Sequence, residues 1–264
     1  MSDESVTLDL EGDVATATIE RPDVRNALTG DVSEGLIDAV DAVEGSDARC
    51  LVIEGSEGDF CAGGDVNMMV EGLTGDVTPD EKERTITQYT HRSIARVARC
   101  PIPTIAKVDG AAFGAGGSLT LACDLVLASD DARISFGFRQ VGLALDSGAS
   151  ALLPRVVGMH VAKELAYTGE VVEADRAEDL GLFNRVYPVD EFDERVREFA
   201  ERIAAGPTTA LKTTKHLLDR NVGRSLEAAM DAEAAAQAGV LETDDHREGA
   251  EAFIEGREPE FTGE

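Results

Sequence analysis

The sequence has four cysteines, no long apolar run and few basic residues among its 264 positions. The cysteines stand at 50, 61, 100 and 123, so no C-x-x-C pair occurs and neither a disulfide framework nor a zinc site is expected. The four histidines also lack metal-ligand spacing, and we predict no metal. No run of about 20 apolar residues occurs, and no apolar segment follows Met1. We therefore expect a cytoplasmic protein with reduced, buried cysteines.

Positive charge is scarce: 24 lysines and arginines stand against 52 aspartates and glutamates, for a net charge of −28. A chain this acidic repels nucleic acid and anionic membranes, so neither is expected as a partner. The acidic residues are spread along the whole chain rather than gathered in one tail. This distribution is typical of a protein adapted to concentrated salt, where a Debye length of roughly 3 Å screens self-repulsion.

Strand-like and helix-like segments alternate along the chain, which indicates an α/β fold. Residues 6–10 and 14–19 alternate apolar and polar positions around a tight turn, and they predict a β-hairpin. Further strands are predicted at 49–55, 104–108, 124–128, 132–136 and 184–188. Helices are predicted at 32–43 (capped by Thr29 or Asp31), around 89–97, and at 161–168, 174–180, 191–205, 208–221, 225–238 and 244–254.

The last third of the chain is mostly helical. We divide the chain into an α/β core, residues 1–200, and a C-terminal helical region, residues 201–264. A helical tail of this length is either an extra layer on the core or a platform for oligomerisation.

Two glycine-rich segments each follow a predicted buried strand. Residues 109–118 (DGAAFGAGGS) follow the strand at 104–108, and residues 60–65 (FCAGGD) follow the strand at 49–55. A strand that turns through small residues into a helix leaves free backbone N–H groups, which suit an anion or a developing oxyanion. Neither segment fits a phosphate-binding G-x-x-x-x-G-K-[ST] loop. The two segments either converge on one oxygen or are simply tight packing corners.

Four stretches together resemble the enoyl-CoA hydratase/isomerase (crotonase) superfamily. They are 21–28 (RPDVRNAL), 60–66 (FCAGGDV), 103–110 (PTIAKVDG) and 245–253 (DHREGAEAF). The resemblance implies a core of repeated ββα units and C-terminal helices that assemble a homotrimer or a dimer of trimers. It also implies an acyl-CoA substrate, with coenzyme A as part of that substrate rather than as a separate cofactor.

The resemblance implies particular roles for residues of these stretches. The backbone N–H groups of Gly64 and Ala115 would bind the thioester oxygen and stabilise an enolate. The thioester end of the substrate would be lined by Ala62, Gly63, Asp65 and Val66. Coenzyme A would be bound by Arg25, Ala27 and Lys215. For the two cations the alternative is an ordinary solvated charge.

The sequence departs from the hydratase pattern at two positions. Hydratases carry one glutamate in the helix after the central glycine segment, where this chain has Ser118, and another where it has Phe138. Neither residue acts as a general base at neutral pH. Conventional hydration is therefore not the preferred prediction.

A third position points to a different reaction. Residues 142–150 (GLALDSGAS), with 153–158 (LPRVVG) after them, resemble the branch that includes the phenylacetate-pathway ring-epoxide isomerase. That branch keeps one aspartate at the position of Asp146. A single carboxylate beside an enolate-stabilising site can move a proton from one carbon to another, which is isomerisation. The alternative is that Asp146 caps the following helix.

His91 offers a further alternative. A histidine on the helix before the central strand, together with Asp146, resembles the aroyl-CoA dehalogenase branch, in which the aspartate attacks the ring and the histidine activates water. A structural histidine is the alternative interpretation. We predict an isomerase of unsaturated acyl-CoA with Asp146 as the acid/base. The rivals are enoyl-CoA hydration and a non-catalytic homologue that only binds coenzyme A.

Overall fold

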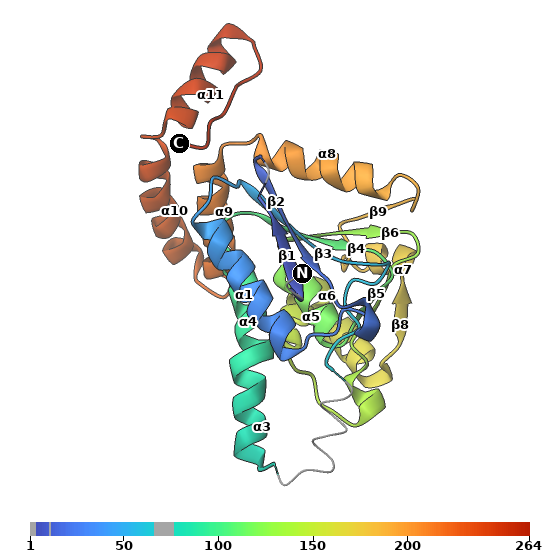
Figure 1. Ribbon diagram of the computed structural model, residues 1–264. Coiled ribbons are helices and arrows are strands. Elements are labelled where there is room, and N and C mark those ends of the chain that lie inside the picture. Colours follow the sequence, from blue (N-terminus) through green and yellow to red (C-terminus); the bar gives the residue numbers. More distant parts are fainter. Residues whose placement is uncertain (1–3, 11, 66–76) are drawn as a thin grey trace.

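The computed structural model describes residues 4–10, 12–65 and 77–264, and its centre is a six-stranded sheet (Figure 1). The predicted hairpin is confirmed, because β1 (Val6–Asp9) pairs antiparallel with β2 (Val14–Ile19). Four parallel strands come next in the order β3 (Cys50–Gly55), β4 (Thr104–Val108), β6 (Leu125–Ser129) and β9 (Arg185–Tyr187). Each of them lies within one residue of its prediction at either end.

A second, three-stranded sheet was only partly predicted. It consists of β5 (Ala111–Phe113), β7 (Arg133–Ser135) and β8 (Val171–Glu173), with β5 parallel to β7 and β8 antiparallel to it. The sequence predicted that the strand at 104–108 turns directly into a helix, but β5 intervenes. Strands of three residues are too short to show an alternating pattern, which is why β5 and β8 escaped prediction.

Within the described ranges, helices and helical turns cover both faces of the main sheet or stand at one side of it. They are η1 (Pro22–Val24), α1 (Gly30–Glu44), α3 (Pro79–Ile86), the π-helical turn η2 (Thr87–His91), α4 (Arg92–Ala98), α5 (Ala115–Ala122), η3 (Gly137–Val141), α6 (Ala149–Thr168), α7 (Ala174–Asp179), α8 (Phe192–Ala204), α9 (Thr208–Asn221), α10 (Leu226–Val240) and α11 (Asp244–Glu255). No helix within the described ranges has the length and apolar character needed to cross a membrane.

Helices α1 and α6 show how local chemistry determines where a helix begins or kinks. Thr29, one of the two predicted caps, does cap α1, since its hydroxyl accepts a hydrogen bond from Val32 N at 3.2 Å. The first half of α6 was not predicted because Pro154 lies inside it and Gly158, with φ of 75°, kinks it. Both residues disrupt the helical periodicity that a sequence pattern depends on.

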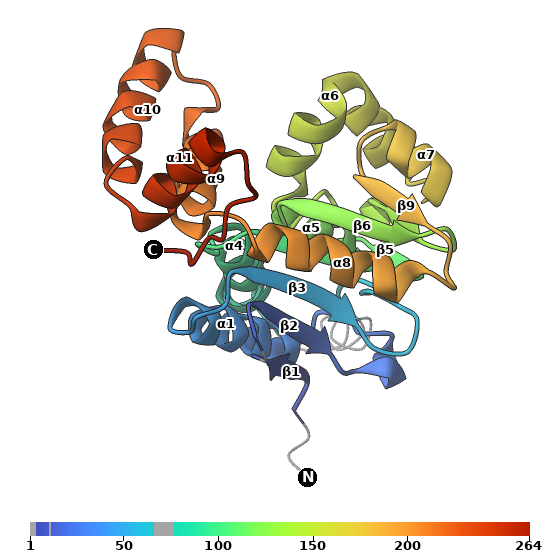
Figure 2. The ribbon, with the colours of Figure 1, turned by 90° about the horizontal axis from the view of Figure 1, so that it is seen from above.

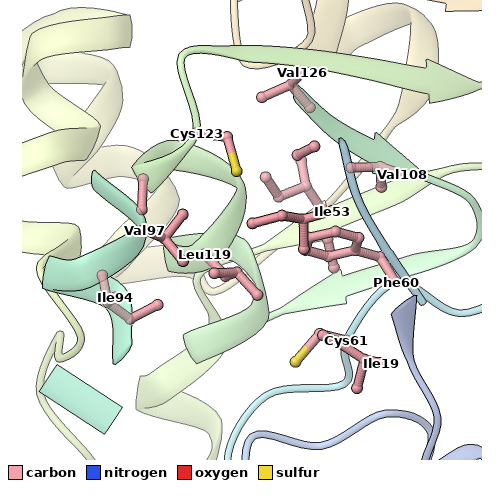
Figure 3. Packing of buried hydrophobic residues seen from close by; sticks show 14 of the residues in the cluster. Ile19, Ile53, Phe60, Cys61, Ile94, Val97, Val108, Leu119, Cys123 and Val126 are labelled. Atoms are coloured by element: carbon pink, nitrogen blue, oxygen red, sulfur yellow. The ribbon is translucent and has the colours of Figure 1, made fainter. Parts of the chain in front are cut away.

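The main sheet is buried on both faces, so alternate residues of β3 serve two cores. Leu51 and Ile53 face α1, α4, α5 and α6, and Figure 3 shows Ile53 beside Leu119 of α5. Cys50 and Val52 face α8, which lies across the opposite side of the sheet (Figure 2). Burial on both faces explains why this strand is a continuous apolar run rather than an alternating one.

Helices α9–α11 stand together at one side of the molecule (Figure 2). The guanidinium of Arg49 ties this region to the core, because Nε donates to Thr208 Oγ1 and Nη2 to Gly206 O, both at 2.6 Å. The same side chain donates from Nη1 to Phe261 O near the C-terminus at 3.2 Å. The division of the chain at residue 200 stays a prediction, and α8 runs across that position.

Candidate active site

The two glycine-rich segments lie against each other through backbone hydrogen bonds. Cys61 N donates to Ala111 O at 2.9 Å, and Phe113 N donates to Cys61 O at 3.0 Å. These bonds make an isolated parallel bridge between Cys61 and Ala112. The segment that follows the carboxyl end of β3 therefore lies beside the segment that contains β5.

Glycine is required where the segments touch. Gly63 has φ of 102°, and a Cβ there would lie 2.7 Å from Phe113 O and 3.6 Å from Ala115 N. At Gly116 a Cβ would lie only 2.1 Å from Cys61 O. Because any larger residue at either position would push the backbones apart, these glycines set the spacing between the segments.

The N–H groups of Gly64 and Ala115 have no acceptor among the described residues. Ala115 is the first residue of α5, and Gly114, which precedes it, makes no side-chain cap. An uncapped helix N-terminus leaves its first N–H groups free and carries partial positive charge. Two such donors, on neighbouring segments, are suited to bind one carbonyl oxygen.

The loop 21–28 supports the first segment from outside. Ala62 N donates to Arg25 O at 3.0 Å, and Leu28 N donates to Gly63 O at 2.7 Å. Asn26 is fully buried, and its amide donates to Ser56 O and Asp59 O at 2.8 and 2.7 Å. Asn26 was not predicted from the sequence; its φ of 56° is left-handed, a conformation in which asparagine is enriched among non-glycine residues.

Arg25, the predicted coenzyme A ligand in this loop, pairs with Asp59. Its guanidinium donates to both carboxylate oxygens, at 2.7 and 3.1 Å, and its side chain stays 58% exposed. Burial raises the pKa of Asp59, but Arg25 and the N–H of Ala111 outweigh burial and hold that pKa below its ordinary value. Asp59 was also missed, because nothing in the sequence shows that it pairs with Arg25.

Asp146 lies between η3 and α6, close to α5. Its backbone oxygen accepts a hydrogen bond from Ser118 Oγ at 3.4 Å. Its carboxylate oxygen Oδ1 lies 2.5 Å from His91 Nε2 and accepts a hydrogen bond from Ser147 N at 2.6 Å. Helix α6 instead begins after Gly148 and has no side-chain cap, so the alternative that Asp146 caps the helix is wrong.

Ser118 and Phe138, which stand at the hydratase glutamate positions, both lie beside Gly114. Ser118 is fully buried, and its hydroxyl donates to Gly114 O at 3.2 Å. The Phe138 ring would lie 3.9 Å from a Cβ placed on Gly114. Neither side chain ionises, whereas Asp146, which contacts Ser118 of α5, carries a carboxylate that pairs with His91.

The remaining predicted site residues are divided between two places. Ala27, Ala62 and Asp65 belong to the two neighbouring loops described above, while Val66 lies outside the described residues. Lys215 lies at the amino ends of β4 and β6, where its ammonium donates to Asp124 Oδ2 at 2.7 Å and to Ile102 O at 3.1 Å. The structure therefore does not bring Lys215 together with the glycine segments, which come after the carboxyl ends of strands.

Comparisons with known proteins match nearly the whole chain. The enoyl-CoA hydratase/isomerase family model matches residues 9–264. The 1,2-epoxyphenylacetyl-CoA isomerase of Escherichia coli is 32% identical over 96% of this chain and 97% of its own length. The crotonyl-CoA hydratase of Syntrophomonas wolfei is 34% identical over 99% of both chains. The crystal structure of an enoyl-CoA hydratase/isomerase from Cupriavidus metallidurans superposes with a TM-score of 0.91 at 32% identity, covering 100% of this chain and 98% of that one.

The family match spans all four stretches on which the resemblance was based. The solved structure covers both sheets and the C-terminal helices. The chain belongs to the enoyl-CoA hydratase/isomerase family, and it is an acyl-CoA enzyme with the crotonase fold.

Proposed function

We propose that the protein isomerises an unsaturated acyl-CoA by proton transfer, with Asp146 as the single acid/base. The observation that carries the proposal is the contact between Asp146 and α5, the helix whose first N–H group is that of Ala115. The contact is made by the backbone oxygen of Asp146, and it joins this residue to the helix whose N-terminus would bind the thioester carbonyl, which supports Asp146 as the acid/base. The chain offers no glutamate at the two positions from which hydratases activate water.

The proposed reaction has two proton transfers on one enolate. Asp146 removes a proton from the carbon next to the thioester carbonyl, and the C–H electron pair becomes the enolate double bond. The N–H groups of Gly64 and Ala115 stabilise the negative charge on the oxygen, each contributing roughly 3–4 kcal/mol. Asp146 then returns the proton to the far carbon of the original double bond, so the double bond moves without net gain or loss of atoms.

The discriminating experiment measures C–H exchange and product formation in deuterated water, in concentrated salt, with a panel of enoyl-CoA esters. We expect exchange and double-bond migration without net hydration. Asp146→Asn should lower kcat by about 10²–10⁴-fold, the usual contribution of a positioned acid/base, with little change in coenzyme A affinity. Net hydration would support the hydratase alternative, and an unchanged rate in the variant would refute the role of Asp146. The absence of any turnover in the unaltered protein would favour a non-catalytic binder.

A second candidate is removal of a halogen from an aroyl-CoA ring. The contact of 2.5 Å between His91 and Asp146 favours it, since an attacking carboxylate and a water-activating histidine would have to be neighbours. In that reaction an Asp146 oxygen displaces halide from the ring, and water then hydrolyses the resulting ester. Release of halide from haloaroyl-CoA esters, measured beside the isomerase assay, separates the two candidates.

We also propose that the protein assembles as a homotrimer, alone or as a dimer of trimers, through α9–α11. Large apolar side chains are exposed there, including Phe253 at 88% and Ile254 at 82%. A monomer rarely exposes an apolar patch spread over three helices. Light scattering in concentrated salt should give a mass of three or six chains, and Phe253→Glu should lower that mass.

A further inference from the structure

We propose that His91 is a positioning residue that holds the Asp146 carboxylate so that only Oδ2 faces the substrate. The inference rests on the proposed function, because it concerns the carboxylate that would move the proton. Both side chains reach the surface, with His91 44% and Asp146 36% exposed, so a substrate can approach the pair. An exposed pair of this kind adds little to stability, so its geometry needs another explanation.

One oxygen of Asp146 is occupied and the other is free. Oδ1 receives His91 Nε2 at 2.5 Å and Ser147 N at 2.6 Å. Among the described residues no group is hydrogen-bonded to Oδ2. Two donors on one oxygen fix the plane and direction of a carboxylate, which leaves the second oxygen as the base that a carbon acid would meet.

The backbone that carries Asp146 is unusual. Ser147 has φ of 56°, a left-handed value that is uncommon outside glycine, and Gly148 comes next with φ of 80°. Ser147 is buried, and its hydroxyl has no hydrogen-bond partner among the described residues. Strained backbone beside an unsatisfied buried hydroxyl persists where the surroundings hold it in place, and here it directs Ser147 N at Oδ1.

His91 is held by an equally unusual element. It is the last residue of η2, a π-helical turn inserted between α3 and α4. A single π-turn adds one residue to a helix and so rotates the two flanking helical segments relative to each other. Helix α4 is anchored by Ile94 and Val97, which are buried in the core (Figure 3). Ile94 also lies 3.9 Å from a Cβ placed on Gly148, so the same helix packs against the turn that carries Asp146.

The test separates the hydrogen bond from the ring itself. His91→Phe keeps a flat ring of similar size and removes the donor, whereas His91→Gln places an amide N–H near the position of Nε2. We expect His91→Phe to lower kcat by about 10–100-fold, with KM within about 2-fold of the unaltered protein. His91→Gln should recover kcat to within about 5-fold of the unaltered value. His160→Phe, at an exposed histidine of α6, is the matched control and should change neither constant.

Each outcome has one meaning. Unchanged kcat in His91→Phe would overturn the inference, and so would His91→Gln as inactive as His91→Phe, because the imidazole would then transfer the proton itself. A KM effect without a kcat effect would also overturn it. Thermal unfolding of each variant separates a loss of fold from a loss of positioning. Asp146→Asn, measured in the same assay, separates the two proposals. If Asp146→Asn keeps its kcat, the proposed function fails. If only His91→Phe keeps its kcat, the inference about His91 fails and the proposed function stands.

Discussion

The contact between the two glycine segments predicts that Gly116→Ala, which adds a single methyl group, lowers both stability and kcat. In Gly116→Ala the new Cβ would lie 2.1 Å from Cys61 O, whereas real Cβ atoms essentially never approach closer than 3.0 Å. The segments must therefore separate by at least about 0.9 Å. Overpacking of this kind costs about 1–3 kcal/mol, which in a domain of this size lowers Tm by roughly 2–12 °C.

The same displacement should reduce catalysis by more than the loss of stability explains. It moves the N–H groups of Gly64 and Ala115 relative to each other, and a misplacement of about 1 Å lowers a rate by about 100-fold. We therefore expect kcat to fall by roughly 10²–10³-fold at a temperature where the variant is still fully folded.

A matched control exists in α10. Gly239 is also a helical glycine, and a Cβ there meets nothing within 4 Å. Gly239→Ala should stabilise the protein by about 0.5–1 kcal/mol through helix propensity, with unchanged kcat. Calorimetry and the exchange assay on both variants test the reasoning. If Gly116→Ala unfolds at the temperature of the unaltered protein, the close contact is wrong; if it unfolds earlier but keeps its kcat, the two N–H groups are not the catalytic donors.

Charged residues give four further predictions. Arg25→Ala should raise KM for coenzyme A thioesters but not for pantetheine thioesters that lack the nucleotide, with kcat unchanged in steady-state assays. The pKa of Asp59 is lowered in the folded protein, so its carboxylate stabilises the fold above about pH 4. This stabilisation is lost as the pH falls through the pKa that Asp59 has in the folded state. The Tm difference between the unaltered protein and Asp59→Asn should therefore shrink in acid. Lys215→Met should lower the free energy of unfolding by about 1–3 kcal/mol in denaturant titrations, because the Asp124 carboxylate and Ile102 O lose their hydrogen-bond donor. KM should stay constant if Lys215 does not bind the substrate. The net charge of −28 predicts a lower Tm in dilute buffer than in about 2 M KCl, and equal values would refute adaptation to salt.

Much of the fold could be predicted because its signals are local. The apolar runs at β3 and β4 and the cap at Thr29 depend on neighbours in sequence, and the structure confirms them. The short strands β5 and β8 could not be predicted, because three residues carry no period and their partners are distant in the chain. The first half of α6 was hidden by a proline and a glycine that the tertiary structure accommodates with a kink.

The candidate site divides in the same way. Residue type and spacing alone singled out both glycine segments, and the resemblance to the family singled out Asp146 and the two positions without glutamate. It left open whether Asp146 caps a helix and whether His91 is structural. Only the tertiary structure decided that Cys61 and Ala112 lie side by side, that Gly148 rather than Asp146 precedes α6, and that His91 lies against the Asp146 carboxylate. Contacts between residues dozens of positions apart depend on how the helices pack on the sheet, and no local pattern in the chain encodes that packing.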